Sequence, residues 1–112
     1  MRDELIAEHV MGLIVREYAG ELFAFSKYGD GHLASEGALV NYSTDDDAAW
    51  FVLRKMAERS YRTTLLTYGG GEQQRWEVSF MGRASEYGHS ISTSFAEAVC
   101  VAALRALGVT DG

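Results

Sequence analysis

The chain has no proline and a single cysteine, Cys100, among its 112 residues. One cysteine cannot form an internal disulfide, and a lone thiol is typical of a reducing compartment. No apolar run approaches the ~20 residues that cross a bilayer. The N-terminal segment has acidic residues at positions 3, 4 and 8, unlike a signal peptide. These absences predict an intracellular protein that is not embedded in a membrane.

Basic charge is also scarce. Ten Lys and Arg face 16 Asp and Glu, a formal charge of −6, which argues against a protein that follows nucleic-acid phosphates. The acidity has two readings, solubility or a negative surface that competes for a basic groove on a partner. The length predicts one domain, residues 1–112, and the hydrophobic fraction of 47% supplies a core.

Groups with recognisable reaction chemistry are missing as well. His9, His32 and His89 share no metal-ligand spacing, and no Ser-His-Asp or Cys-His motif is present. The glycines at 69–71 lack the Lys-Ser/Thr and the helix of a phosphate loop, so they predict a hairpin turn. We therefore expect no enzyme, no cofactor and no metal.

Periodicity and turn residues predict five units in the order helix, hairpin, helix, hairpin, helix, with antiparallel pairing in layers. The helices are expected over residues 3–11, 44–59 and 94–107, and the strands over 13–18, 21–28, 61–68 and 74–81. Residues 29–41 and 82–90 are predicted to be polar connections, and extended backbone is expected at the end of the second, through Ile91 and Thr93. Gly12 and Gly108 are expected to end helices.

The helix over residues 44–59 is the predicted centre of the fold. Ser or Thr within residues 42–44 could cap it, and three carboxylates follow at its positive end: Asp45, Asp46 and Asp47. Consecutive helical residues point ~100° apart, so these three do not converge on one ion. Apolar spacing predicts a buried stripe flanked by two large aromatic residues: Ala49, Val52, Leu53, Met56 and Ala57, beside Trp50 and Phe51.

The C-terminal half has equally clear patterns. Trp76, Val78 and Phe80 alternate with polar residues, which predicts a strand packed on one side. Ser94 and Glu97 have the spacing of a capping box at the start of the last helix. That helix is rich in alanine, which predicts close approach to a sheet or another helix, and Cys100 lies beside its apolar stripe, where a thiol is inert.

Three runs, taken together and in order, resemble the phage ABA sandwich family over nearly the whole chain. They are Glu8-His9-Val10-Met11-Gly12, Tyr42-Ser43-Thr44-Asp45 leading to Ala48-Ala49-Trp50, and Glu97 to Leu104 with Leu107-Gly108. The resemblance implies a helix–sheet–helix layering, an α+β sandwich of order α-ββ-α-ββ-α. Family members usually have a proline where this chain has Phe95-Ala96, and are less acidic at positions 46 and 47.

The resemblance brings no catalytic residues and implies a phage or prophage protein in the host cytoplasm that acts by binding. The first hypothesis is an anti-defence inhibitor of the anti-CRISPR type that occupies a host or defence protein. It would use the acidic helix end and nearby loop residues: Asp45, Asp46, Asp47, Tyr28, Asp30 and Glu36. Neither nucleic acid nor membrane is an expected partner.

Two alternatives remain open. One is a sponge for a defence nucleotide, with stacking and positive groups at a dimer interface: Arg62, Arg75, Arg83, Tyr87 and His89. The other is a structural or assembly protein of the phage. Homodimerisation is the default expectation, because symmetric dimers are the commonest oligomers.

Overall fold

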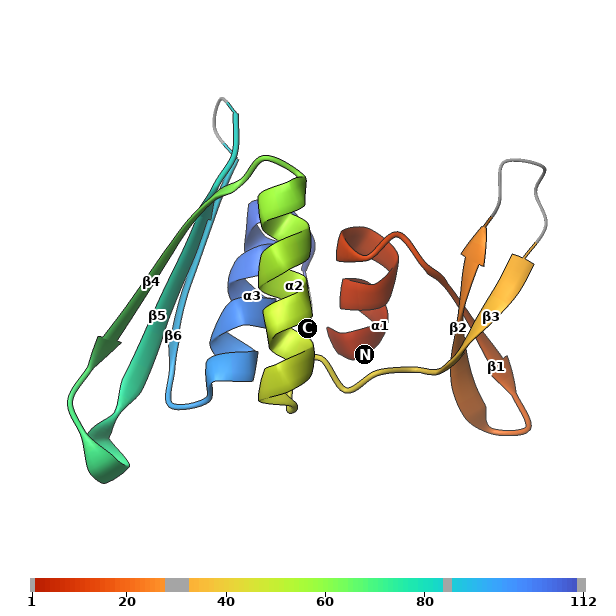
Figure 1. Ribbon diagram of the computed structural model, residues 1–112, viewed down its shortest axis with the longest axis horizontal. Coiled ribbons are helices and arrows are strands. Elements are labelled where there is room, and N and C mark those ends of the chain that lie inside the picture. Colours follow the sequence, from red (N-terminus) through yellow and green to blue (C-terminus); the bar gives the residue numbers. More distant parts are fainter. Residues whose placement is uncertain (1, 28–32, 84–85, 111–112) are drawn as a thin grey trace.

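Figure 1 shows the chain as a computed structural model, which describes residues 2–27, 33–83 and 86–110. The elements in chain order are α1 (Arg2–Leu5), the π-helical turn η1 (Ile6–Val10), β1 (Ile14–Tyr18), β2 (Glu21–Lys27), β3 (Leu33–Ala38), α2 (Asp46–Glu58), β4 (Arg62–Tyr68), the 3-10 turn η2 (Gly71–Gln73), β5 (Arg75–Met81), β6 (Tyr87–Ser92) and α3 (Phe95–Ala106).

The strands form two separate antiparallel sheets of three, ordered β1-β2-β3 and β4-β5-β6, and the helices lie between them (Figure 1). The mixed helix and sheet class is confirmed, but the order α-ββ-α-ββ-α is wrong because each predicted hairpin has a third strand. β3 (Leu33–Ala38) lies within residues 29–41, which were predicted as a connection. β6 (Tyr87–Ser92) begins within the predicted connection 82–90 and continues into the extended end expected there. These strands read LASEGA and YGHSIS, poor in the β-branched residues that mark strands in a sequence.

The first sheet is joined to the rest at one side. Val15 on β1 and Leu39 after β3 pack against the central core. The Tyr18 ring contacts two phenylalanine rings of β2, with centroids 6.2 Å from Phe23 and 6.0 Å from Phe25. The first sheet thus has an aromatic cluster of its own, separate from the main core.

The main core lies between α2, α3, η1 and the inner face of the second sheet. Val78 and Phe80 are fully buried and Trp76 packs beside them, which confirms the predicted inward face of β5. Ten of the 12 residues of α3 are buried, Cys100 among them. The predicted close approach of this helix is confirmed at Gly88 of β6, where an added Cβ would lie 2.0 Å from the carbonyl oxygen of Ala102.

The central helix begins at a different cap from the one predicted. The carboxylate of Asp45 accepts hydrogen bonds from the amides of Asp47 at 2.9 Å and Ala48 at 3.3 Å, so the cap is Asp45 and not residues 42–44. Ala57 is exposed and not part of the buried stripe, whereas Ala48 is buried. The buried stripe of α2 is therefore Ala48, Ala49, Val52, Leu53 and Met56.

The N-terminal elements α1 and η1 are bonded to the residues just before and just after α2. The backbone amide of Ser43 donates to the Asp3 carboxylate at 2.8 Å, and the Arg59 guanidinium donates to the carbonyl oxygen of His9 at 2.6 Å. Gly12 has φ +73° just beyond η1, the left-handed conformation expected there. Among the described residues, no helix has the length and apolar character needed to cross a membrane.

Candidate functional site

The outer face of the second sheet is the side of β4, β5 and β6 that points away from the helices (Figure 1). Strand alternation and register place these side chains on it: Arg62, Thr64, Leu66, Tyr68, Arg75, Glu77, Ser79, Met81, Tyr87, His89 and Ile91. Five of them are large and apolar or aromatic, and each is 44% to 52% exposed: Leu66, Tyr68, Met81, Tyr87 and Ile91. Large apolar and aromatic side chains that are half exposed on one face are typical of interaction surfaces.

A hydrogen-bonded group crosses the middle of the outer face. The Tyr68 hydroxyl donates to the Glu77 carboxylate, and His89 Nε2 lies 3.3 Å from Glu77 Oε1. The bond from Tyr68, and then that from His89, holds the pKa of Glu77 below its ordinary value, while the same bond raises the pKa of Tyr68. The Tyr87 ring stacks on the His89 imidazole with 9° between the planes. These contacts connect all three strands and orient the two tyrosines and the histidine.

One end of the sheet is basic. The register aligns Arg62, Met81 and Tyr87 across the three strands, and Arg83 follows two residues after Met81. A hollow of about 290 Å³ lies between the exposed side chains of Arg62 and Arg83, and Ser60 also lines it. Guanidinium groups in such positions bind carboxylate or phosphate.

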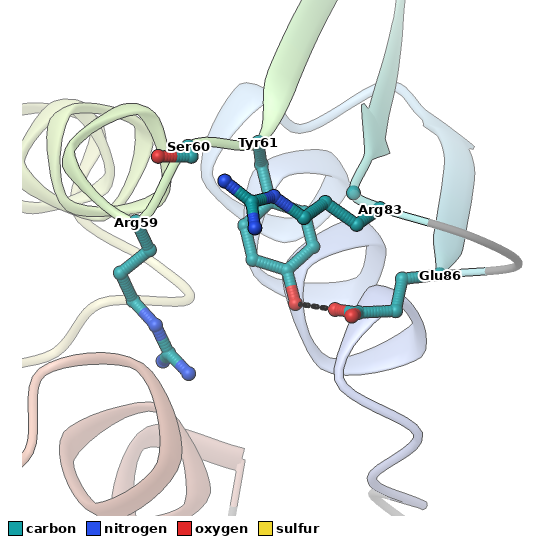
Figure 2. Close-up of a pocket in the computed structure, with 6 residues that line it drawn as sticks. Arg59, Ser60, Tyr61, Arg83 and Glu86 are labelled. Carbon is teal, nitrogen blue, oxygen red and sulfur yellow. Dashed lines mark hydrogen bonds between the residues drawn. The ribbon is translucent and has the colours of Figure 1, made fainter.

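A second cavity of about 290 Å³ adjoins it on the side of α2, lined by Arg59, Ser60, Tyr61, Gly82, Arg83 and Glu86 (Figure 2). The hydroxyl of Tyr61, a largely buried residue, donates to the Glu86 carboxylate. Burial, and then the bond to Glu86, raises the pKa of Tyr61. Arg59 is already engaged with the carbonyl of His9, so Arg83 is the cation that this cavity offers to a ligand.

The predicted acidic contact set is divided by the structure. Asp45 is occupied as the helix cap, whereas Asp46 and Asp47 are exposed in the first turn of α2. Tyr28 and Asp30 lie outside the described residues, and Glu36 lies on β3. The acidic end and the basic end are at opposite ends of α2, a helix of 13 residues, and are thus roughly 20 Å apart along its axis.

The alternative ligand set is brought partly together. Arg62 and Arg83 line one hollow at the basic end, and Tyr87 lies in the same row as Arg62, with Met81 between them. His89 lies one row further along the outer face. Arg75 lies at the other end of the sheet, opposite Tyr68. Sequence reasoning missed the pairing of Tyr61 with Glu86, because a contact across 25 residues leaves no local signal. It also missed the exposed apolar residues Leu66, Met81 and Ile91.

The described residues contain no group of three or more His, Cys, Asp or Glu side chains placed to hold a metal ion. The outer face and the basic end present apolar, aromatic and cationic groups, which are suited to recognition of a partner surface or an anionic ligand.

Comparison with known proteins agrees with this architecture. A crystal structure of a phage protein from Bacillus cereus ATCC 14579 superimposes with a TM-score of 0.63 at 18% identity, covering 94% of this chain and 87% of that one. This likeness concerns the fold. No curated protein matches the sequence. The profile of the phage ABA sandwich domain matches residues 4–104. The chain therefore belongs to the phage ABA sandwich domain family.

Proposed function

We propose that this phage domain is a non-enzymatic binding protein that acts in the host cytoplasm by occupying a host or defence-system protein through the outer face of its second sheet. The observation that supports this proposal is the set of five large side chains, each about half exposed, on a sheet face that the helices leave open. Tyrosine, methionine and arginine are enriched in protein interfaces, and all three occur here.

The distribution of charge favours an acidic partner surface. Residues 59–112 hold five arginines and five acidic residues, so the whole excess of six negative charges lies in residues 1–58. The outer face has Arg62 and Arg75 at its two ends, and Arg83 lies beyond β5. A partner with an apolar patch bordered by carboxylates would complement this surface, and charge complementarity also raises the association rate.

The direct test compares three tagged proteins in host lysates that contain CRISPR or other defence systems. One is the native chain. The second is Leu66→Thr/Met81→Thr/Ile91→Thr, which keeps strand-forming residues and removes the three aliphatic side chains of the set. The third is Phe51→Ser, a matched control because Phe51 is 56% exposed on α2, away from the outer face. A retained protein would be identified, purified and titrated against all three by calorimetry.

We expect the native chain and Phe51→Ser to bind the purified partner equally and the triple variant to lose at least tenfold in affinity, since buried interface anchors cost 1–2 kcal/mol or more when truncated. Equal affinity for the triple variant would contradict the proposal. The acidic end of α2 stays a prediction as a second contact. An Asp46→Ser/Asp47→Ser variant tests it separately.

The basic end favours a second candidate, sequestration of a defence nucleotide. The supporting observation is the position of Arg62, Arg83 and Tyr87 around one end of the sheet, which would suit a phosphate and a stacked base. Cyclic and ADP-ribose-type nucleotides at 100 times their dissociation constant would stabilise the fold by ~2.7 kcal/mol. A thermal shift absent from the native chain, or unchanged in Arg62→Gln/Arg83→Gln, would exclude this alternative.

A further inference from the structure

β4, one of the two edge strands of the second sheet, is incompletely covered on its inner side. α3 packs along β5 and β6, whereas α2 packs mainly on α3 and leaves space beside β4. A groove of about 480 Å³ results, lined by Trp50, Leu53, Arg54, Ala57, Thr63 and Leu65. It lies on the opposite side of β4 from the outer face, because Thr63 and Leu65 alternate with Arg62, Thr64 and Leu66 along the strand.

The lining of the groove combines apolar walls with two polar groups. Trp50 is 55% exposed, and its ring is held in place by Phe95 at a centroid distance of 5.0 Å. Arg54 lies at the margin with its guanidinium 5.8 Å from the Phe51 ring centroid. Within the part of the chain that the structure describes, the shielded hydroxyl of Thr63 is the buried side-chain oxygen or nitrogen that lacks a hydrogen-bond partner. A shielded hydroxyl without a partner is costly, and rotation of the Thr63 side chain about χ1 would turn this oxygen toward a ligand in the groove.

We propose that this groove binds an extended peptide segment of a partner protein, which adds as a fourth strand beside β4. An edge strand directs every second N–H and C=O away from its sheet, and the described residues place no strand on that side of β4. A peptide strand would pair with these groups and insert an apolar side chain between Trp50, Leu53 and Leu65. A carboxylate in the peptide would meet Arg54, which is a matching charge at the groove margin.

The chemistry of the groove distinguishes this occupant from others. A small apolar molecule would fill the pocket but leave the edge of β4 and the Thr63 hydroxyl unpaired. A helix could contact the apolar wall but has no free main-chain groups for the strand edge. An extended chain satisfies the apolar wall, the strand edge and the hydroxyl together. The inference goes beyond the outer-face proposal and does not depend on it, because the two surfaces lie on opposite sides of β4.

The test uses synthetic fluorescein-labelled peptides of about seven residues, long enough for an ordinary strand. Each has a central Val, Leu or Phe in an alternating Thr background, with Asp or Lys at one flank. Each has a twin that is N-methylated at alternate residues, which removes strand hydrogen bonds and keeps the side chains. Binding is measured by fluorescence polarisation. It is also measured by Trp50 emission in a Trp76→Phe variant, because the chain has two tryptophans and this substitution leaves Trp50 alone.

We expect at least one peptide with Asp at the flank to bind with a Kd tighter than about 1 mM. Its N-methylated twin should bind at least about tenfold more weakly. Ala57→Glu places a larger acidic group in the groove from an exposed position and should abolish binding. Thr63→Val should weaken the peptide yet stabilise the fold, because it removes a hydroxyl without a partner. A merely structural Thr63 would leave the peptide affinity unchanged.

The matched controls are Glu58→Gln, exposed next to Ala57 on α2, and the outer-face triple variant, and both should bind the peptide as the native chain does. Binding of no peptide at about 1 mM would overturn the proposal. Equal binding of the N-methylated twin would exclude strand addition, and loss of binding in the outer-face variant with retention in Ala57→Glu would place the peptide elsewhere.

Discussion

Gly88 is the position at which the packing of α3 on the second sheet can be tested most sharply. A Cβ at this residue would lie 2.0 Å from the carbonyl oxygen of Ala102 and 2.3 Å from the backbone nitrogen of Ala106. Real Cβ atoms essentially never approach heavy atoms closer than 3.0 Å, so Gly88→Ala requires β6 and α3 to separate by at least about 1 Å.

The cost follows from what must move. Overpacking costs about 1–3 kcal/mol when side chains can shift. At Gly88 the obstructing atoms are backbone atoms of a helix that is buried on ten of its 12 residues, so we expect about 3 kcal/mol or more. The free energy of unfolding falls by ~2 kcal/mol per molar urea, so a loss of about 3 kcal/mol should lower the urea midpoint of unfolding by about 1.5 M.

Gly70→Ala is the matched control for this experiment. Gly70 has extended backbone and open space around it, with no heavy atom within 4 Å of an added Cβ. The same chemical change there should be neutral, or stabilising by about 0.4–1 kcal/mol through the unfolded chain. Urea unfolding followed by circular dichroism measures both variants. If Gly88→Ala unfolds within about 0.5 kcal/mol of Gly70→Ala, the close contact between β6 and α3 is refuted.

Three further changes test other parts of the fold. Asp45→Ala should lower the free energy of unfolding by about 1 kcal/mol through loss of the cap of α2, whereas Asp46→Ala should be near neutral in the same thermal unfolding assay. Arg59→Gln removes the 2.6 Å bond to the carbonyl of His9 and should cost about 1 kcal/mol, with faster amide exchange in α1 and η1 as the specific readout. Burial raises the pKa of Cys100 from 9.0 to about 12, so above pH 9 the unfolded chain releases a proton that the folded chain keeps, and stability falls as pH rises. Cys100→Ala should reduce that fall by about 1.4 kcal/mol per pH unit, measured as urea midpoints at about pH 8 and pH 10.5, and an identical fall in both proteins would contradict a buried thiol.

The elements that sequence reasoning placed correctly are those whose signal is local. The stripe of α2, apart from Ala57, and the alternation of β5 each repeat with the period of one element, and the capped start of α3 at Ser94 lies within a single turn. The Ser94 hydroxyl accepts from the Glu97 amide at 3.2 Å, which is one half of the predicted capping box, whereas the Ser94 amide donates to the Ser92 hydroxyl at 3.0 Å. Such patterns need no knowledge of the remainder of the chain.

The tertiary structure decided the rest, because sheet pairing and surface clusters depend on residues far apart in the chain. β3 and β6 are strands through hydrogen bonds to β2 and β5, although their own residues are weak strand formers. The basic end joins Arg62, Arg83 and Tyr87 through strand register, and the groove exists because α2 leaves the inner side of β4 uncovered. The sequence by itself determined which segments are helical and which faces are apolar, and long-range packing determined which of those faces stay open for a partner.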